Sequence, residues 1–324
     1  MDENLNGPVL VTGGTGFLAR HTILHLLERG LSVRTTLRSV ARAEMLRGVL
    51  AAAGADLARL QLVEADLLAA ETWPPAVDGV SAILHMATPM VGNDVIAAAR
   101  EGTRHVLEAG AQAGVDRIVL TSSGLAAAPR GISAVTELDW TDPDTPGTTP
   151  YAAAKTIAER LAWDLAARHQ LRLTTILPGI ILGPALGPDR PAWLGVIQSM
   201  LAGKLPALPP VNLQLVDVRD AAALHVDALF QPAAIGQRYL AAGETLSFRD
   251  IALILKSQRS GEKVSTREMP GWLLRLLAFF SSELRQLAAL RDAPGMDAAK
   301  AARELDWHPR PARQSVLDAA ASLS

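Results

Sequence analysis

The chain has 324 residues, 49% of them hydrophobic and 20% charged, which is typical of a globular protein and excludes a largely disordered chain. The formal net charge of -2, without a cluster of Lys and Arg, gives no electrostatic basis for binding nucleic acid. The absence of cysteine excludes disulfides, thiolate metal sites and a cysteine nucleophile.

Up to about residue 177, short apolar runs alternate with segments of helical periodicity. Runs that are apolar throughout predict strands buried on both faces, as in a parallel sheet covered by helices. The alternation therefore predicts an α/β fold, a Rossmann-type doubly wound sheet over residues 1–177. The expected strands are 8–12, 32–37, 60–64, 82–85, 117–121 and 172–177, and the expected helices lie near 16–29, 40–53, 93–113 and 151–169.

After Pro178, prolines become frequent and helices dominate. Residues 178–324 are expected to form mainly a smaller, mostly helical substrate-binding lobe, while about 211–242 return to the core. The expected helices lie near 192–202, 218–230, 247–258, 271–290 and 311–322, with late strands at 213–216 and 238–241.

The most apolar long stretch, residues 271–290, carries Arg275, Glu283 and Arg285. A membrane span needs about 20 predominantly apolar residues without such interruptions, so a packed helix is the better interpretation. The first residues are acidic and polar, unlike a secretory signal. We therefore expect a cytoplasmic protein without a membrane segment, either a monomer or a homodimer.

The first expected strand runs directly into residues 12–19, Thr-Gly-Gly-Thr-Gly-Phe-Leu-Ala, and a helix follows. Glycines at such a turn let a pyrophosphate approach the backbone, and the helix N-terminus offers free N–H groups. A glycine-rich stretch alone is weak evidence, but its place after the first strand of an alternating pattern makes it specific. The expected cofactor contacts here are Gly13, Thr15, Gly16, Phe17 and Leu18.

The end of the second strand bears on the choice between NADH and NADPH. NAD-preferring sites place Asp or Glu there, about 20 residues beyond the glycines. Residues 33–39 contain no carboxylate, but they contain Arg34, Arg38 and Ser39. Because a guanidinium binds a 2′-phosphate through charge-assisted hydrogen bonds, Arg38, helped by Arg34 or Ser39, favours NADPH/NADP+. The alternative is that these arginines are ordinary surface residues.

Further cofactor contacts are expected where the third and fourth strands end. Asp66 and Leu67 follow the third strand, where a carboxylate can accept a hydrogen bond from the adenine amino group. Ala87 and Thr88 follow the fourth strand, where small residues let the backbone pass close to the cofactor. Taken alone, either pair could be ordinary strand-end chemistry.

The fifth strand ends in Ser122-Ser123, and Tyr151 and Lys155 follow at the start of an expected helix. The i to i+4 spacing places the phenol and the ammonium on one helix face. A phenol is a poor acid–base catalyst at neutral pH, and a nearby ammonium is expected to lower its pKa. Ser123 would bind the substrate oxygen while Tyr151 donates the proton. The alternative is a helix-start tyrosine and a solvated lysine.

With these motifs, the sequence resembles the extended short-chain dehydrogenase/reductase family, in the branch of dihydroflavonol reductases, cinnamoyl-CoA reductases and microbial aldehyde/ketone reductases. The resemblance spans nearly the whole chain and is carried by residues 12–19, 33–38, 65–67, 85–89, 121–123, 151–155, 177–179, 182–184 and 216–220. It implies that Ser123, Tyr151 and Lys155 are catalytic, with Lys155 also holding the nicotinamide ribose. It implies further that Arg38 binds the 2′-phosphate and that residues 178–184 close over the nicotinamide through Pro178, Gly179 and Ile180.

Two departures limit what the resemblance implies. The plant flavonoid enzymes carry a longer insert between the catalytic serine and tyrosine, so a flavonoid substrate is not expected. Residues 97–101 lack the Asn often found before Gly-Thr, so no Asn is assigned to the catalytic set. Met90, Leu125 and Trp193 are candidates for a hydrophobic substrate pocket, although aromatic residues at helical spacing are more often core.

These motifs predict an enzyme that reduces a small-molecule aldehyde or ketone with NADPH. Three alternatives stay open: a hydroxysteroid dehydrogenase, a sugar-nucleotide epimerase or dehydratase, and a non-catalytic NADPH sensor. The epimerase and dehydratase reading expects an Asn where Pro178-Gly179-Ile180 stands. His21 and His25 have a metal-ligand spacing on the first helix, but no third ligand is in view, so packing or surface roles are favoured.

Overall fold

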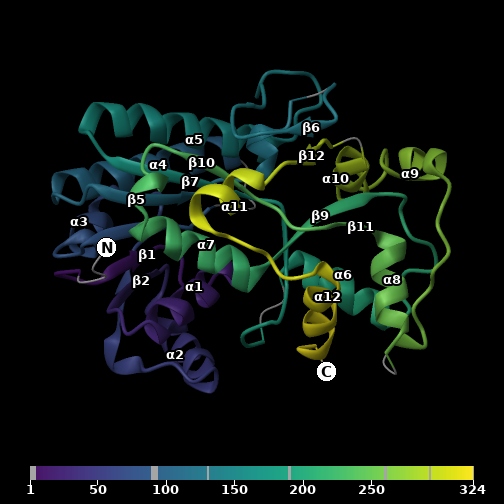
Figure 1. Cartoon of the computed structure of the whole chain (residues 1–324), viewed down its shortest axis with the longest axis horizontal. Coiled ribbons are helices and arrows are strands. Elements are labelled where there is room, and N and C mark those ends of the chain that lie inside the picture. Colours follow the sequence, from purple (N-terminus) through teal and green to yellow (C-terminus); the bar gives the residue numbers. More distant parts are fainter. Residues whose placement is uncertain are drawn as a thin grey trace.

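The computed structural model describes residues 5–88, 94–129, 131–188, 191–258, 261–291 and 293–323. Its main feature is a seven-stranded parallel sheet in the order β10-β7-β5-β4-β1-β2-β3 (Figure 1). The chain order reverses between β1 and β4, which is where ligands bind in open α/β sheets. The strands are β1 (Val9–Val11), β2 (Val33–Leu37), β3 (Leu60–Glu64), β4 (Ala82–His85), β5 (Arg117–Thr121), β7 (Arg172–Pro178) and β10 (Arg238–Ala241).

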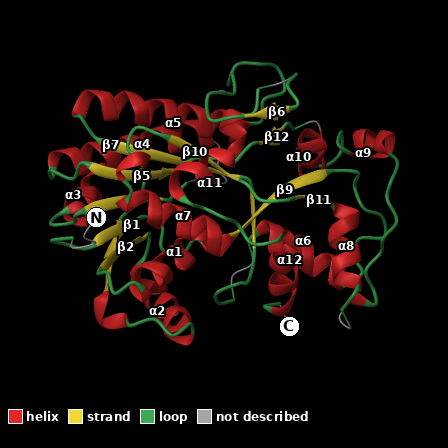
Figure 2. Ribbon diagram, viewed as in Figure 1, coloured by secondary structure: helices red, strands yellow, loops and turns green. Residues whose placement is uncertain are grey.

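Helices cover both faces of this sheet (Figure 2). Because side chains alternate along a strand, Val9 and Val11 of β1 face one core while Leu10 faces the other. The first core is shared with α1 (Phe17–Glu28), α2 (Ala43–Ala52), α7 (Val218–Phe230) and α11 (Ala299–Leu305). The second is shared with α3 (Trp73–Val77), α4 (Val95–Gln112) and α5 (Pro150–His169). The predicted doubly wound fold is confirmed.

A second, three-stranded sheet has the order β11-β9-β8, with β8 (Ile180–Leu182), β9 (Asn212–Asp217) and β11 (Thr245–Ser247). The helices packed around it are α6 (Ala192–Leu201), α8 (Phe248–Lys256), α9 (Gly271–Leu277), α10 (Ser282–Arg291) and α12 (Ala312–Ala321). We call these strands and helices the small-sheet lobe. Its core contains Leu194, Phe248, Leu274 and Val316.

Short segments connect the two parts of the molecule. The strands β6 (Ala134–Val135) and β12 (Gly295–Met296) pair with each other, joining the chain after β5 to the chain after α10. Within the expected return segment 211–242, α7 and β10 pack on the large sheet, whereas β9 stays in the small one. The short 3-10 helices are η1 (Val40–Arg42), η2 (Leu57–Arg59), η3 (Ala70–Thr72), η4 (Gly124–Ala127) and η5 (Pro232–Ala234).

The helix predicted over residues 271–290 is wrong as a single helix. The chain leaves α9 through tight turns, in which Phe279 N–H and Phe280 N–H donate to the carbonyls of Leu276 and Leu277. Ser281 Oγ then accepts a hydrogen bond from Leu284 N–H, and α10 starts there. A serine that caps a new helix competes with continuation of the previous one.

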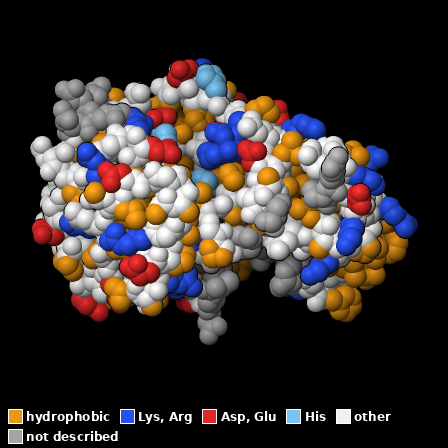
Figure 3. Space-filling view, turned by 90° about the horizontal axis from the view of Figure 1, so that it is seen from below, with side chains coloured by type: hydrophobic (Ala, Val, Ile, Leu, Met, Phe, Trp, Pro, Cys, Tyr) orange, Lys and Arg blue, Asp and Glu red, His pale blue; other side chains and the backbone are white. Residues whose placement is uncertain are grey.

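Acidic and basic side chains are interspersed on the face shown in Figure 3, as the near-neutral formal charge predicts. Among the described residues, no helix is both long enough and apolar enough to cross a membrane.

Candidate active site

The glycine turn lies at the carboxyl edge of the large sheet, between β1 and α1. Gly13 has a φ of 73°, and a Cβ there would lie 3.0 Å from the Ala87 side chain. A Cβ on Gly14 would lie 2.2 Å from Thr35 Oγ1. No side chain caps the start of α1 after Gly16, so its first N–H groups face outward from the turn. This cradle fits the pyrophosphate of a dinucleotide, as the sequence predicts.

The ends of β1 and β4 are fastened together beside this turn. Thr12 Oγ1 accepts hydrogen bonds from the N–H groups of Met86 and Ala87, at 3.0 and 2.9 Å. The same oxygen lies 2.9 Å from Nδ1 of the buried His85. The backbone at Ala87 is therefore held against Gly13, which leaves no room for a larger side chain at position 13.

The arginines of the second strand lie at opposite ends of it. Arg38 is exposed at the carboxyl end of β2, where the sequence places the 2′-phosphate. Arg34 lies near the other end and donates to Gln61 Oε1 at 3.1 Å and to the Ala76 carbonyl at 3.2 Å. Its expected help to Arg38 is wrong, because these bonds hold the Arg34 guanidinium near the amino end of β2, whereas Arg38 lies beyond the carboxyl end. Ser39 Oγ accepts from Ala41 N–H at 3.3 Å and begins η1.

The expected adenine-side residues form a compact turn after β3. Asp66 Oδ1 accepts a hydrogen bond from Leu68 N–H at 2.8 Å, and its carbonyl accepts one from Trp73 Nε1 at 2.9 Å. The Leu67 carbonyl lies 2.8 Å from His105 Nδ1. The turn therefore fixes the Asp66 carboxylate at the sheet edge through one of its two oxygens.

Ser123, Tyr151 and Lys155 come together at the start of α5. Thr149 caps this helix by accepting a hydrogen bond from Ala152 N–H, which places Tyr151 in its first turn. The Tyr151 hydroxyl lies near enough to Ser123, which is buried just beyond the end of β5, for the serine to lower the Tyr151 pKa. Lys155 is 5% exposed and donates to Thr88 Oγ1 at 2.8 Å and to the Thr121 carbonyl at 2.9 Å.

Burial controls the electrostatics of this group. It lowers the pKa of Lys155 from 10.5 to about 8, against the opposing effect of the Glu159 carboxylate. It raises the pKa of Tyr151, against the opposing hydrogen bond with Ser123. The expected lowering of the Tyr151 pKa is wrong for this structure, because burial outweighs the other influences and the ammonium is hydrogen-bonded to Thr88 and Thr121. The phenol therefore stays protonated at neutral pH, which is the form that carries a proton to donate.

Two buried histidines flank Lys155. Burial lowers the pKa of His85 to about 3 and the pKa of His225 to about 4. The charge of Lys155 lowers both values further. His225 Nε2 lies 2.9 Å from Thr121 Oγ1, and its Nδ1 lies 2.7 Å from the Ala221 carbonyl. Both imidazoles are therefore neutral near pH 7 and add no positive charge beside the ammonium.

A buried ion pair behind the Ser123–Tyr151–Lys155 group was missed by the sequence analysis. Glu159 and Arg238 are joined at 2.8 Å between Oε1 and Nε. One signal was available, since Glu159 follows Lys155 at the same i to i+4 spacing that links Lys155 to Tyr151. No local signal identifies Arg238, which lies 79 residues further along the chain.

The expected substrate residues lie in different environments. Leu125 is half-buried in η4, two residues after Ser123. Trp193 is half-buried and packs on Phe248 of the lobe core, with ring centroids 6.4 Å apart. Met90 lies outside the described residues.

Residues 178–180 carry the chain from the large sheet to the small one. Gly179 N–H donates to the Ala241 carbonyl at 2.9 Å, and a Cβ on Gly179 would lie 2.6 Å from the Gln214 carbonyl oxygen. Pro178 ends β7 and Ile180 begins β8. The expected wall over the nicotinamide is thus held between β9 and β10.

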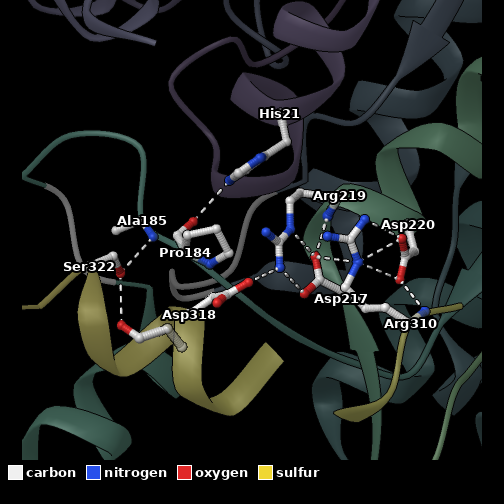
Figure 4. A network of polar contacts seen from close by, with 10 residues as sticks. His21, Pro184, Ala185, Asp217, Arg219, Asp220, Arg310, Asp318 and Ser322 are labelled. Carbon is white, nitrogen blue, oxygen red and sulfur yellow. Dashed lines mark hydrogen bonds and ion pairs between the residues drawn. The ribbon is translucent and has the colours of Figure 1, made fainter. Parts of the chain in front are cut away.

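The segment after β8 is anchored by polar contacts from two sides, from α1 and from the end of α12 (Figure 4). His21 Nε2 lies 3.0 Å from the Pro184 carbonyl, and Ala185 N–H donates to Ser322 Oγ at 2.9 Å. His25 lies 3.9 Å from Glu28. No group of three side chains able to hold a metal ion occurs in the described part of the chain.

Nearby, Arg219 joins α7 to α12 through Asp217 at 2.9 Å and Asp318 at 2.6 Å (Figure 4). Arg310 pairs with Asp220 at 2.7 Å. These contacts fasten the small-sheet lobe to the helix that covers the large sheet.

The fold, the glycine cradle and the polar group at the start of α5 together define a dinucleotide-binding protein of the Rossmann type. Comparison with known proteins refines this class. The NAD dependent epimerase/dehydratase family matches residues 9–242. The chain belongs to this family.

The similar proteins include plant reductases. The chain is 35% identical to cinnamoyl-CoA reductase 1 of Oryza sativa subsp. japonica over 265 residues, 79% of this chain and 78% of the relative. It is 30% identical to dihydroflavonol 4-reductase of Zea mays over 298 residues, 87% of this chain and 83% of the relative. The resemblance predicted from the sequence motifs is confirmed.

A solved structure shows the same fold. The yeast methylglyoxal/isovaleraldehyde reductase Gre2, complexed with NADPH, superposes with a TM-score of 0.82 at 20% identity, covering 98% of both chains. The likeness therefore extends through the small-sheet lobe as well as the large sheet.

Proposed function

We propose that this protein is an NADPH-dependent carbonyl reductase that converts a small or medium-sized aldehyde or ketone to an alcohol. The observation that carries the proposal is the meeting of Ser123, Tyr151 and Lys155 beside the glycine turn. Reductases among its relatives and an NADPH complex of the same fold support it.

The cofactor would lie along the carboxyl edge of the large sheet. Gly13, Thr15, Gly16, Phe17 and Leu18 would hold the pyrophosphate, because the turn and the free N–H groups of α1 lie there. Arg38 would bind the 2′-phosphate, and Asp66 and Leu67 would face the adenine. On the nicotinamide side, the contacts would come from Ala87, Thr88, Tyr151, Lys155, Pro178, Gly179 and Ile180. When bound, NADPH supplies the hydride.

The side chains of this chain supply the remaining chemistry. Ser123 and Tyr151 donate hydrogen bonds to the substrate oxygen, which orients the carbonyl and stabilises negative charge as it develops there. Tyr151 then gives its proton to that oxygen as general acid. The Lys155 ammonium stabilises the phenolate left behind, because an opposite charge nearby favours the ionised form. Leu125 and Trp193 would contact apolar parts of the substrate.

The proposal is tested by following NADPH consumption with aromatic aldehydes, diketones, α-keto esters, flavanonols and ketosteroids, and with NADH in parallel. We expect turnover with NADPH on one of the simple carbonyl classes. Turnover confined to ketosteroids would support a hydroxysteroid dehydrogenase instead. Epimerisation or dehydration of a sugar nucleotide, or NADPH binding with no turnover on any compound, would overturn the proposal.

A further inference from the structure

Glu159 is a fully buried carboxylate one helical turn beyond Lys155 in α5. Its oxygens accept hydrogen bonds from Ser122 Oγ at 2.6 Å, Thr175 Oγ1 at 2.6 Å and Arg238 Nε at 2.8 Å. Carboxylates are almost never fully buried unless they are paired in this way. The three partners come from the end of β5, from β7 and from β10, so one side chain ties α5 to three adjacent strands.

This tie bears directly on the geometry of the catalytic group. Ser122 precedes Ser123 at the end of β5, while Tyr151 and Lys155 lie on α5. The separation between serine and tyrosine is therefore set by how α5 sits on β5. Together with the bond from Lys155 to the Thr121 carbonyl, Glu159 fixes this packing through polar contacts, whereas the other contacts between α5 and the sheet are mainly apolar.

Glu159 and Lys155 also line the same small cavity. It has a volume of about 10 Å³, which suits roughly one water molecule, and its wall includes Thr88, Thr121 and Ser122. Arg238 is not among the lining residues. Glu159 therefore borders the cavity together with Lys155, whereas its guanidinium partner does not.

The charged and titratable groups around Lys155 come from three elements. Tyr151 and Glu159 lie on α5, His85 ends β4, and His225 lies on α7. The two histidines are neutral, as argued above, and the phenol is protonated. Among these groups of the described chain, Glu159 is the one carboxylate. Its charge opposes the effect of burial on the pKa of Lys155.

Arg238 has further partners of its own. Its Nη1 donates to the carbonyls of Glu137 and Asp139 at 2.6 and 2.7 Å, and its guanidinium stacks 3.7 Å from the Trp140 ring centroid. The arginine thus holds the segment after β6 against β10. If the ion pair were purely structural, its role would be limited to holding these segments together, and Glu159 would have no effect on Lys155.

We propose that Glu159 is a positioning residue for the reductase reaction, which fixes α5 against the strand that carries Ser123 and holds the Lys155 side chain as an ammonium. This proposal rests on the proposed function for its catalytic meaning. Its physical content, the effect of one buried carboxylate on one lysine, does not depend on turnover.

The test compares Glu159→Gln with Thr175→Val, which removes one hydrogen bond to the same carboxylate without removing charge. The chain has five lysines, so the Cε resonances of carbon-13-labelled lysine can be followed by NMR against pH, with Lys155 assigned by its loss in Lys155→Met. We expect Glu159→Gln to lower the Lys155 titration midpoint by about one pH unit, since removing an opposite charge at close range has such an effect. Thr175→Val should leave the midpoint unchanged.

The pH profile of kcat supplies the second measurement. In Glu159→Gln the loss of activity on the alkaline side should move to lower pH together with the lysine midpoint, and it should not move in Thr175→Val. An unchanged midpoint in folded Glu159→Gln would overturn the proposal. If that variant does not fold, Glu159→Gln with Arg238→Met removes both buried charges, and a midpoint equal to that of the parent would overturn it equally. Absence of turnover in the parent would refute the proposed function alone, because the NMR midpoint still tests Glu159.

Discussion

The large sheet and the small-sheet lobe bury different kinds of side chain. Around the large sheet, charged and imidazole groups are buried, among them Arg117, Lys155, Glu159 and His225. In the described part of the lobe, Ser315 is the buried polar residue apart from Asp217, which ends β9 at the border between the two regions. Buried polar groups cost free energy unless their partners are fixed in advance. Buried polar groups are therefore concentrated around the large sheet, where the proposed proton transfer takes place, whereas the core of the small-sheet lobe is mainly apolar.

The largest effect is expected when one hydroxyl is removed from the polar region around the large sheet. The chain has two tyrosines, Tyr151 and Tyr239. Tyr239 lies away from the candidate site, and its hydroxyl donates a hydrogen bond to Glu304 Oε2 at 2.8 Å. We expect Tyr151→Phe to lower kcat about a thousandfold, because the general acid is lost, with the Kd for NADPH nearly unchanged. Tyr239→Phe should cost about 1 kcal/mol of unfolding free energy and leave kcat intact. Equal kcat values in the two variants would contradict the mechanism.

Acid is expected to destabilise the region around the large sheet more than the lobe, because the large sheet is surrounded by buried histidines. His21, His85 and His225 all lie around the large sheet, and burial lowers the pKa of His225 from 6.5 to about 4. Their neutral burial stabilises the fold fully above pH 6.5, and this contribution is lost as the pH falls toward about 4, because the unfolded chain binds protons first. For His225 alone the loss is roughly 3 kcal/mol.

Urea unfolding between pH 7 and pH 4 measures this loss, and hydrogen exchange locates it. Peptides of the large sheet should lose protection before those of the lobe core. The slope of stability against pH should become shallower in His225→Gln and stay unchanged in His308→Gln, whose side chain is 72% exposed. Simultaneous loss of protection in both regions would remove this distinction between them.

A smaller effect, on the preference between NADPH and NADH, is expected at Arg38, where the 2′-phosphate of the cofactor would bind. Arg38→Asp should reduce the preference for NADPH over NADH roughly 10- to 100-fold, because a carboxylate replaces the cation expected at the 2′-phosphate. Arg34→Ala, at the other end of the same strand, loses the bond to Gln61 and should change stability without changing the preference. The ratio of kcat/KM for the two cofactors measures both. An unaltered ratio in Arg38→Asp would exclude Arg38 from the phosphate site.

The smallest effect is expected where the two regions are joined. Ser322→Ala removes the acceptor of the Ala185 N–H and should lower the unfolding free energy by about 1 kcal/mol. The kcat of this variant should stay within twofold of the parent value, since Ser322 touches none of the reacting groups. A large loss of kcat would show that the segment after β8 takes part in the reaction step.

The sequence predicted the large sheet well for a physical reason. Its strands are short, most of them are rich in apolar residues, and turn residues bound them, so the expected and observed bounds agree to within one residue. The glycine turn and the Tyr151–Lys155 pair were also visible, because each depends on local spacing. The very short strands β6, β8, β11 and β12 were not predicted, since two or three residues carry no period.

The residues that the sequence did not reveal are those whose role depends on distant partners. Glu159 reads as a helix charge until Arg238 is brought to it by the pairing of β10 with β7. The sequence offered Arg34 as a helper of Arg38, and only the contact of Arg34 with Gln61 on the neighbouring strand shows that it is held elsewhere. Long-range pairing of this kind is decided by the tertiary fold, which no local pattern records.

The anchoring of the Ala185 segment by α12 has a consequence for the order of events during biosynthesis. The glycine turn, the Ser123–Tyr151–Lys155 group and the Glu159–Arg238 pair are all encoded before β11 begins. The partners Asp318 and Ser322 are synthesised much later. A nascent chain that has reached residue 242 therefore already contains the residues of the proposed active site, but the wall beside it closes only when α12 emerges from the ribosome.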